Sequence, residues 1–200
     1  KNLNLKDRVL FDMILQYLIE TTGREFSPEN LVNYFNSQNR KISKETIYTY
    51  VDGLCRALIL KKVYRYDIAG KSVLKKINKY YATDLGIAQI KNNNPEFKSY
   101  IVLENIVYNE LIYRGYEVYI GKTKNGEVDF LAKKDGVTKY IQVTYEMNGN
   151  ESTIEREFGA YKYIDDNNPK YVISLDKIDL SRAGIIHLNL IDFLLNEDFS

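Results

Sequence analysis

Two residue types that often bind metals or act in catalysis are almost absent from the sequence, which contains one cysteine and one histidine among 200 residues. The single cysteine, Cys55, excludes an intramolecular disulfide bond and a cysteine-based zinc site, and it is typical of a protein from a reducing cytoplasm. The single histidine argues against a Ser-His-Asp catalytic centre. That residue, His187, lies in a short strand-like stretch (184–188), so we expect it to be a structural side chain.

Long hydrophobic runs are also missing. No apolar stretch approaches the roughly 20 residues of a membrane-spanning helix, and no signal peptide is recognisable, so we expect a cytoplasmic protein without a membrane partner. Hydrophobic residues make up 44% of the chain and charged residues 28%, which is ordinary for a globular protein with a buried core. The first residue is lysine rather than methionine, and we therefore expect the chain to be part of a longer protein.

Charge is balanced overall but not along the chain. The net charge of +1 gives no electrostatic argument for a nucleic-acid or membrane partner of the whole molecule. Residues 1–83 nevertheless carry 15 Lys/Arg against 8 Asp/Glu, whereas residues 84–200 carry 13 against 19. A basic first part joined to an acidic second part predicts two functional units, which we place at 1–84 and 85–200.

The first unit contains three helix patterns followed by a hairpin pattern. Apolar residues recur at helical spacing over 5–20, and Ser27 followed by Pro28 is a typical start for a helix reaching about residue 37. A third helix is expected from residue 43, with an inner stripe formed by Ile47, Val51, Leu54 and Leu58. Strand-like stretches at 63–68 and 73–81 complete the order of a winged helix-turn-helix domain.

Lysine and arginine residues are distributed along the third helix and the hairpin, with tyrosines between them. Because Lys and Arg dominate contacts to phosphates, these side chains are candidates for a DNA-binding surface. Winged helices also serve as protein-interaction modules. In that case the lysine and arginine side chains would only keep the surface hydrated. The residues leave both interpretations open. With Arg156 of the second unit added, the candidate nucleic-acid-binding residues are Lys44, Arg56, Lys61, Lys62, Lys71, Lys75 and Arg156.

The second unit has the element order α-β-β-β-α-β-β-α, which predicts an α+β fold with a mixed sheet flanked by helices. After a polar loop at 91–95 come a helix at 99–113 and a strand at 116–120. The strands at 126–132 and 138–145 are separated by an Asp135-Gly136 pair, a strong hairpin signal. A helix at about 153–164, strands at 171–175 and 185–188, and a helix at 191–195 complete the order.

Acidic residues occur at two apolar positions of this unit. Asp129 lies in the middle of an apolar strand, and Glu104 has only apolar neighbours three and four residues away along its helix. Burying a carboxylate is costly unless it is paired or binds a metal. Gln142, on the partner strand, would add a third oxygen, so Glu104, Asp129 and Gln142 are candidate ligands of a magnesium ion and candidate catalytic residues.

These residues carry a resemblance to a known superfamily. The phrases concerned are Leu103-Glu104-Asn105, Arg114-Gly115-Tyr116-Glu117-Val118, Glu127-Val128-Asp129-Phe130, Tyr140-Ile141-Gln142-Val143 and Arg156-Glu157-Phe158. A glutamate on a first helix, an aspartate on a second strand and a polar triplet on the next strand resemble PD-(D/E)xK, or restriction-endonuclease-like, proteins. Residues 85–200 look more closely like a domain of unknown function that follows the ATPase module of many prokaryotic AAA+ proteins. The resemblance implies an ATPase domain before residue 1, preceding the winged helix, and ATP binding only through that absent domain.

The sequence departs from the nuclease pattern where active members have a lysine. Gln142-Val143-Thr144 replaces acid-x-Lys, and Thr144 cannot supply the positive charge that positions the attacking water. Lys139 is an odd number of residues from Gln142 and faces the other side, while Lys122 or Lys124 would have to reach the site from a turn. Loss of such a charge costs roughly a hundredfold in rate. We therefore expect an inactive or weak nuclease-like domain.

Three hypotheses follow for the function. The leading one is a nucleic-acid-associated module of an AAA+ ATPase, with DNA and the ATPase domain of the same chain as partners. The alternatives are an active magnesium-dependent DNA endonuclease and a protein-interaction module that regulates the ATPase. Arg156 and Glu157 either face the site, with the arginine binding phosphate, or form an exposed ion pair. Homo-oligomer formation stays open.

Overall fold

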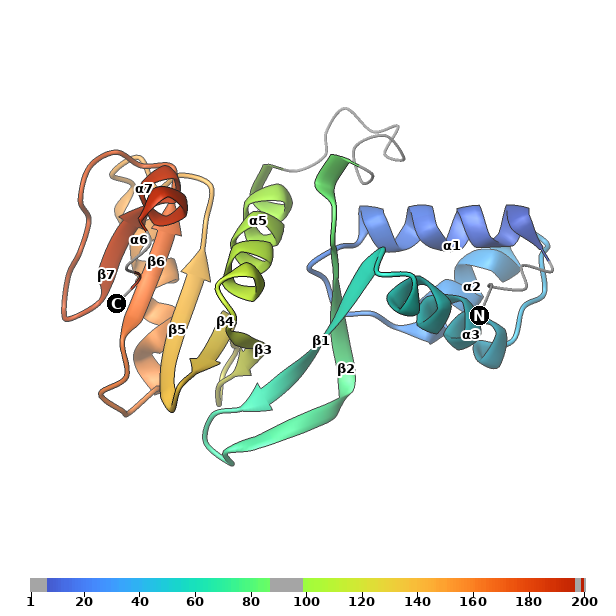
Figure 1. The fold of residues 1–200 in the computed structure, drawn as a ribbon, viewed down its shortest axis with the longest axis horizontal. Helices are drawn as coiled ribbons and strands as arrows, with labels where there is room; N and C mark the ends of the chain where they lie inside the picture. Colours follow the sequence, from blue (N-terminus) through green and yellow to red (C-terminus); the bar gives the residue numbers. More distant parts are fainter. Residues whose placement is uncertain (1–6, 87–98, 197–198, 200) are drawn as a thin grey trace. The chain divides into compact units, whose positions relative to one another are not determined.

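The computed structural model describes residues 7–86, 99–196 and 199 (Figure 1). The chain divides into two compact units: the first is Lys1–Lys62 with Ile77–Phe97, and the second is Val63–Lys76 with Lys98–Ser200. The middle of the predicted hairpin is thus grouped with the second unit. The expected boundary after residue 84 stays a prediction. In the described parts of the chain, no helix has the length and apolar character needed to cross a membrane.

Three helices and the base of a β-hairpin make up most of the described part of the first unit. The helices are α1 (Arg8–Glu20), α2 (Pro28–Ser37) and α3 (Lys44–Arg56), and the hairpin strands are β1 (Leu60–Asp67) and β2 (Ser72–Ala82). Side chains cap the start of each helix: Asp7 accepts from the Leu10 amide, Ser27 from Asn30 and Ser43 from Thr46. Ser27 followed by Pro28 therefore starts α2 as the sequence predicts.

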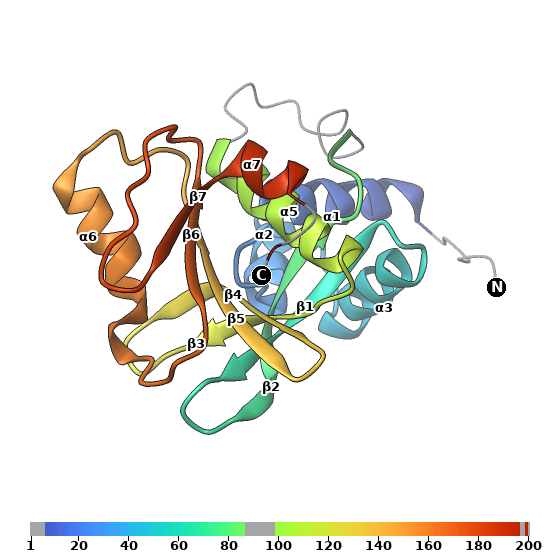
Figure 2. The same ribbon diagram turned by 60° about the vertical axis from the view of Figure 1, so that its left-hand side comes forward.

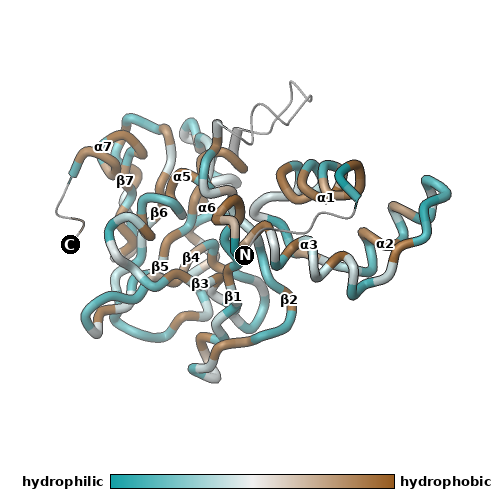
Figure 3. Tube along the Cα trace, turned by 45° about the vertical axis from the view of Figure 1, so that its right-hand side comes forward, coloured by the Kyte–Doolittle hydropathy of each residue, from teal (hydrophilic) through white to brown (hydrophobic). Residues whose placement is uncertain are grey.

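The three helices enclose the core of the first unit. Ile14 of α1, Leu31 of α2 and Ile47 of α3 are completely buried, and α1 is largely hydrophobic along its length (Figure 3). The predicted inner stripe of α3 is wrong at its last member. Leu58 lies beyond the helix end at Arg56, has a positive φ of 59° and leaves 60% of its surface exposed, because the chain has already turned towards β1.

The second unit is built on a mixed β-sheet. Its remaining strands are β3 (Glu117–Lys122), β4 (Glu127–Lys134), β5 (Val137–Val143), β6 (Lys170–Ser174) and β7 (Ile186–Asn189). The seven-stranded sheet has the order β2-β1-β3-β4-β5-β6-β7. β3, β4 and β5 are antiparallel neighbours, whereas β1 runs parallel to β3, β5 parallel to β6, and β6 parallel to β7. The outer half of the hairpin therefore extends this sheet.

Helices cover both faces of the sheet in the second unit (Figure 2). They are α5 (Ser99–Tyr113), α6 (Glu151–Gly159), a short 3-10 helix η1 (Ala160–Tyr163) and α7 (Leu190–Leu195). On the α5 face, the ring of Tyr108 lies 6.0 Å from that of Phe130. On the α6 face, Ile154 and Phe158 pack with Leu131 and other side chains of the central strands. Each strand thus contributes alternate residues to two apolar layers.

The Asp135-Gly136 pair forms the two-residue turn of the β4–β5 hairpin, as predicted. Lys134 pairs with Val137, and both turn residues have positive φ angles, 50° and 79°. This is the geometry that favours Asp-Gly in tight hairpins. The other helices and strands lie within a few residues of their predicted positions. The polar loop expected at 91–95 lies outside the described residues.

The fold class is therefore mixed α+β. Six α-helices and the seven-stranded mixed sheet account for most of the residues that the structure describes.

Candidate functional site

Asp129 and Gln142 are neighbours on the α6 face of the sheet. The ladder pairs Phe130 with Ile141, so the next residues along each strand stand side by side. The amide of Val143 donates to Asp129 Oδ2 at 2.8 Å, and the amide of Asp129 donates to Gln142 Oε1 at 3.3 Å. Both side chains thus help to hold the ends of the two strands together.

Gln142 connects this pair to Glu157 of α6. Gln142 Nε2 donates to Glu157 Oε2 at 3.1 Å. Both polar atoms of the Gln142 side chain therefore have protein partners, the oxygen at the Asp129 amide and the nitrogen at Glu157. A continuous chain of hydrogen bonds runs from Asp129 through Gln142 to Glu157 across two strands and a helix.

Arg156 supplies a positive charge at the end of this chain. Its Nε and Nη2 donate to Glu157 Oε1 at 3.0 and 2.6 Å. The Glu157 side chain is only 7% exposed, whereas that of Arg156 is 71% exposed. The ion pair, one of the two alternatives that the sequence left open, is present, but its acid is buried and only its base faces solvent. The four residues Asp129, Gln142, Arg156 and Glu157 are called the acidic cluster below.

Tyr161 of η1 lies beneath the acidic cluster. Its side chain is buried, and its hydroxyl donates to the Tyr171 carbonyl. Burial raises the pKa of Tyr161 well above its usual value, and the negative charges of Asp129 and Glu157 raise it further. The phenol is therefore a neutral hydrogen-bond donor to the Tyr171 carbonyl.

Glu104 extends from a helix on the other face of the sheet. It lies on α5 one helical turn before Tyr108, the residue that packs on Phe130, and it is half-buried. Asp129 and Gln142 instead face α6 through Glu157. Among the described residues, no group of three or more His, Cys, Asp or Glu side chains is placed to hold a metal ion. The magnesium site of Glu104, Asp129 and Gln142 stays a prediction.

The position of the expected lysine is filled by a buried threonine. Thr144 is 8% exposed, and its amide donates to the Ile173 carbonyl at 3.0 Å, which continues the β5–β6 pairing. Lys139 faces away from the acidic cluster, as its spacing from Gln142 predicts. Its Nζ donates to the Phe199 carbonyl and lies 4.2 Å from the centre of that ring. Burial lowers the pKa of Lys139, and the nearby charges of Arg114 and Lys134 lower it further.

The other two lysines considered for this role are on the surface. Lys122 ends β3 and Lys124 follows it in the turn towards β4, and both are exposed. Lys124 lines a surface pocket together with Thr123 and Ile164.

The predicted nucleic-acid-binding cations are divided between the units. Lys44, Arg56, Lys61 and Lys62 belong to the first unit, and Lys71, Lys75 and Arg156 to the second. On the first unit, Lys44 pairs with Glu29 at 2.5 Å and Arg56 with Asp52 at 2.9 Å. These two charges are therefore partly compensated on the protein surface. Lys71 and Lys75 are exposed on the hairpin.

Tyr161 is a site residue that sequence reasoning did not select, and Glu157 was considered only together with Arg156. Glu157 and Tyr161 both lie on the inner face of the helix, with the buried Ile154 and Phe158 beside them. A signal was present, because Glu157 is three residues after Ile154 and four before Tyr161. This is the same pattern of an acid among apolar helix neighbours that singled out Glu104.

His187 is a buried structural side chain, in keeping with its strand position. It is 6% exposed, and its Nε2 lies 2.8 Å from Ser174 Oγ. Its Nδ1 accepts from the Leu180 amide at 3.3 Å, which leaves the proton on Nε2. Ser174 in turn donates to Asp176 at 2.7 Å. The serine is thus the middle member of this network, an order that does not activate it as a nucleophile.

Comparisons with known proteins show what the chain is similar to. Residues 1–96 match a family described as "Domain of unknown function (DUF8612)". The chain is 31% identical over 192 residues to an uncharacterized protein of Haemophilus influenzae, an alignment that covers 96% of this chain and 47% of that protein. It is 33% identical over 149 residues to an uncharacterized protein of Methanocaldococcus jannaschii, covering 72% of this chain and 32% of that protein. The chain thus spans about half or less of these relatives, and no solved structure matches it.

Proposed function

We propose that the chain is the nucleic-acid-associated module of a longer, AAA+-type ATPase. In this proposal residues 1–84 act as a winged helix-turn-helix and residues 85–200 as a degenerate PD-(D/E)xK nuclease-like domain with little or no cleavage activity. The observation that carries the proposal is the acidic cluster: Asp129, Gln142 and Glu157 are joined by hydrogen bonds on one face of a mixed sheet. The basic surface of the first unit and of the hairpin supports a polyanionic partner.

The chemistry of the acidic cluster favours binding over cleavage. Hydrolysis of a phosphodiester requires a metal-bound or base-activated water and a cation that stabilises the developing charge. Gln142 is neutral and both of its polar atoms are engaged. The guanidinium of Arg156 is always charged, so it binds phosphate but cannot accept a proton. No step is assigned to a metal ion, because Glu104 extends from the opposite face of the sheet and both polar atoms of Gln142 are engaged.

The ATPase part of the proposal rests on the length of the relatives. The chain covers 47% of one relative and 32% of the other, which leaves more than half of each for a further domain. ATP would bind to that domain and not to the residues described here.

A mobility-shift assay with duplex DNA tests the nucleic-acid part. We expect retention at low ionic strength that weakens steeply as salt is added, because phosphate contacts release counterions. Lys71→Glu together with Lys75→Glu should reduce binding and flatten the salt dependence by about one unit of slope for each lost contact. Lys177→Glu, another exposed lysine of the second unit, is the matched control and should bind like the unaltered chain. No shift even at low salt would refute the proposal and favour a protein-interaction module.

A plasmid-cleavage assay with magnesium or manganese tests the degenerate site. We expect no more cleavage by the unaltered chain than by the Asp129→Ala variant. Cleavage that disappears with Asp129→Ala would replace the proposal with an active endonuclease. Circular dichroism of the variant controls for folding, because the Asp129 carboxylate also accepts from the Val143 amide.

A further inference from the structure

Two adjoining surface pockets form a groove on the second unit. The larger pocket has a volume of about 450 Å³ and the smaller one about 380 Å³. They share Ile68 and Ala69 of the hairpin with Tyr163 and Asp165 at the end of η1. We call this continuous feature the tyrosine groove. It lies apart from the acidic cluster, none of whose four residues lines it.

Tyrosine rings form the walls of the groove. The ring of Tyr66 on β1 packs against that of Tyr119, with 5.6 Å between ring centres and an interplanar angle of 53°, and the Lys133 ammonium lies 3.8 Å from the centre of the Tyr66 ring. Tyr140 is buried, and its hydroxyl donates to Asp166 at 2.7 Å. Tyr163 is different, because 45% of its surface is exposed. Tyr66 and Tyr140 are thus fixed walls, and Tyr163 offers a ring to a ligand.

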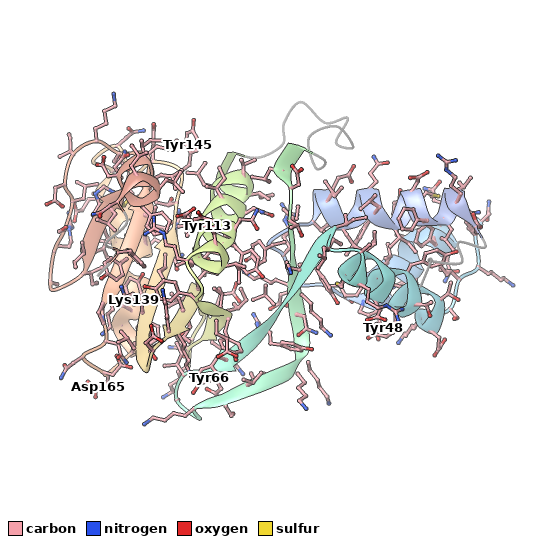
Figure 4. All side chains as sticks on the ribbon, in the orientation of Figure 1. Tyr48, Tyr66, Tyr113, Lys139, Tyr145 and Asp165 are labelled. Carbon is pink, nitrogen blue, oxygen red and sulfur yellow. The ribbon has the colours of Figure 1, made fainter. Side chains whose placement is uncertain are left out.

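The charges around the groove are mainly positive. Lys71 and Lys133 line the larger pocket, and Lys124 and Lys162 line the smaller one. Of the two acids, Asp166 is already bound by the Tyr140 hydroxyl and lies 3.8 Å from the Lys170 ammonium. Asp165 is exposed and belongs to both pockets. Figure 4 shows Tyr66 and Asp165 at the same edge of the second unit, where they line the larger pocket from two different elements.

We propose that the tyrosine groove binds single-stranded nucleic acid. An aromatic face bordered by lysines is the arrangement with which proteins stack exposed bases and follow the phosphate backbone. A base would stack on Tyr163, and the phosphates on either side would lie near Lys71 and Lys162. A duplex cannot place a base against Tyr163, because its bases are stacked within the helix. This inference deepens the proposed function, on which it rests, by naming the form of nucleic acid that this surface takes.

Asp165 adds a preference among the bases. A carboxylate accepts hydrogen bonds from the exocyclic amino groups of adenine, cytosine or guanine, which thymine lacks. Its negative charge also repels phosphate, so it favours a base rather than the backbone at the centre of the groove. Oligocytidine strands should therefore bind more tightly than oligothymidine strands of the same length.

Fluorescence anisotropy with a labelled oligocytidine of about ten nucleotides, within the usual site size, tests the proposal. Tyr163→Ala should weaken binding roughly tenfold, which is a typical loss for one stacked base. Tyr163→Phe keeps the ring and should bind like the unaltered chain. Tyr145→Ala is the matched control, because Tyr145 is 44% exposed in the same unit but lies outside the groove. Unchanged binding by Tyr163→Ala, or equal losses for Ala and Phe, would overturn the inference.

Two further measurements separate this inference from the proposed function. Duplex binding by Tyr163→Ala should equal that of the unaltered chain, because the duplex is assigned to the winged helix and its lysines and not to Tyr163, although one of these lysines, Lys71, also lines the groove. Duplex binding by the unaltered chain without binding of the labelled oligocytidine would refute the groove alone, whereas single-strand binding without duplex binding would refute the winged-helix assignment alone. A mononucleotide such as cytidine monophosphate should compete poorly. Competition as strong as that of the oligonucleotide would contradict a single-strand site and indicate a nucleotide pocket.

Discussion

At the scale of single residues, the buried histidine connects stability to pH. His187 donates from Nε2 to Ser174 and accepts at Nδ1 from Leu180, so the neutral ring satisfies both nitrogens. Burial lowers the pKa of His187, and the nearby carboxylates of Asp176 and Asp179 only partly oppose this effect. The Asp176 carboxylate is itself held by the amides of Met147 and Asn148. A protonated ring would lose the Leu180 hydrogen bond.

We therefore predict that stability falls as the pH is lowered from about 7.5 to 5.5. The unfolded chain takes up a proton near the usual histidine pKa of about 6.5, whereas the folded chain takes it up only at lower pH. Over this window unfolding binds a proton, so the free energy of unfolding decreases by at most about 1.4 kcal/mol per pH unit. Urea denaturation at several pH values measures this change in the free energy of unfolding. Because the sequence has one histidine, His187→Gln should flatten the profile; an equally steep profile in the variant would contradict this origin.

The acidic cluster shows at the same scale how a carboxylate becomes a site residue. Glu157 is buried and receives three hydrogen bonds, one from Gln142 and two from Arg156. Such contacts offset the cost of removing its charge from water. These three donors account for a stable buried carboxylate at this position.

At the scale of elements, the β4–β5 hairpin depends on its turn. Asp135 and Gly136 both have left-handed backbone conformations, and the ladder closes directly beyond them. This two-residue connection fixes the register that brings Asp129 beside Gln142. A change in the turn should therefore affect the stability of the strands that carry the acidic cluster.

Gly136→Ala should lower the free energy of unfolding by about 1 kcal/mol, since a side chain is unfavourable at a positive φ. For a chain of this size the melting temperature should fall by about 2–4 °C. Gly126→Ala is the matched control, because no atom lies within 4 Å of the added methyl group and the backbone there is not left-handed. Thermal unfolding followed by circular dichroism compares them. Equal losses for the two variants would show that the turn conformation is not the cause.

At the scale of the whole molecule, the hairpin is shared between the two compact units. The residues Val63–Lys76 belong to the second unit because β1 pairs with β3, where Arg65 is the partner of Ile120. Arg65 Nη2 also contacts Glu127 Oε2 at 2.5 Å, with side chains only 15% and 29% exposed. This partly buried ion pair joins the outer hairpin to β4.

A double-mutant cycle with Arg65→Met and Glu127→Gln should give a coupling energy of about 1 kcal/mol in the free energy of unfolding, because the pair is shielded from solvent. The matched control is Arg182 with Glu151, a pair at 2.6 Å whose side chains are 39% and 64% exposed. Its coupling should stay below about 0.5 kcal/mol. Chemical denaturation of the unaltered chain, the four single variants and the two double variants measures both cycles. A coupling energy no larger than the control would mean that strand pairing alone holds the hairpin.

The sequence by itself determined the helices and strands, the Asp-Gly turn and the shared face of Asp129 and Gln142. These features follow from the local periods of the chain and from turn chemistry, which neighbouring residues specify. It also predicted that Lys139 points away from this face. Two local inferences were incomplete: Leu58 lies past the helix end, and Glu157 was considered only together with Arg156 although its helix pattern marks it as a buried acid.

The tertiary structure decided what local patterns cannot contain. Only the packing of α6 on the sheet brings Glu157 and Arg156 to Gln142, and only the long-range pairing of β1 with β3 assigns Val63–Lys76 to the second unit. The tyrosine groove likewise combines the hairpin with residues almost a hundred positions later, such as Tyr163. Pairing between distant segments depends on how whole faces fit together, and periodicity within one segment carries no information about its partner.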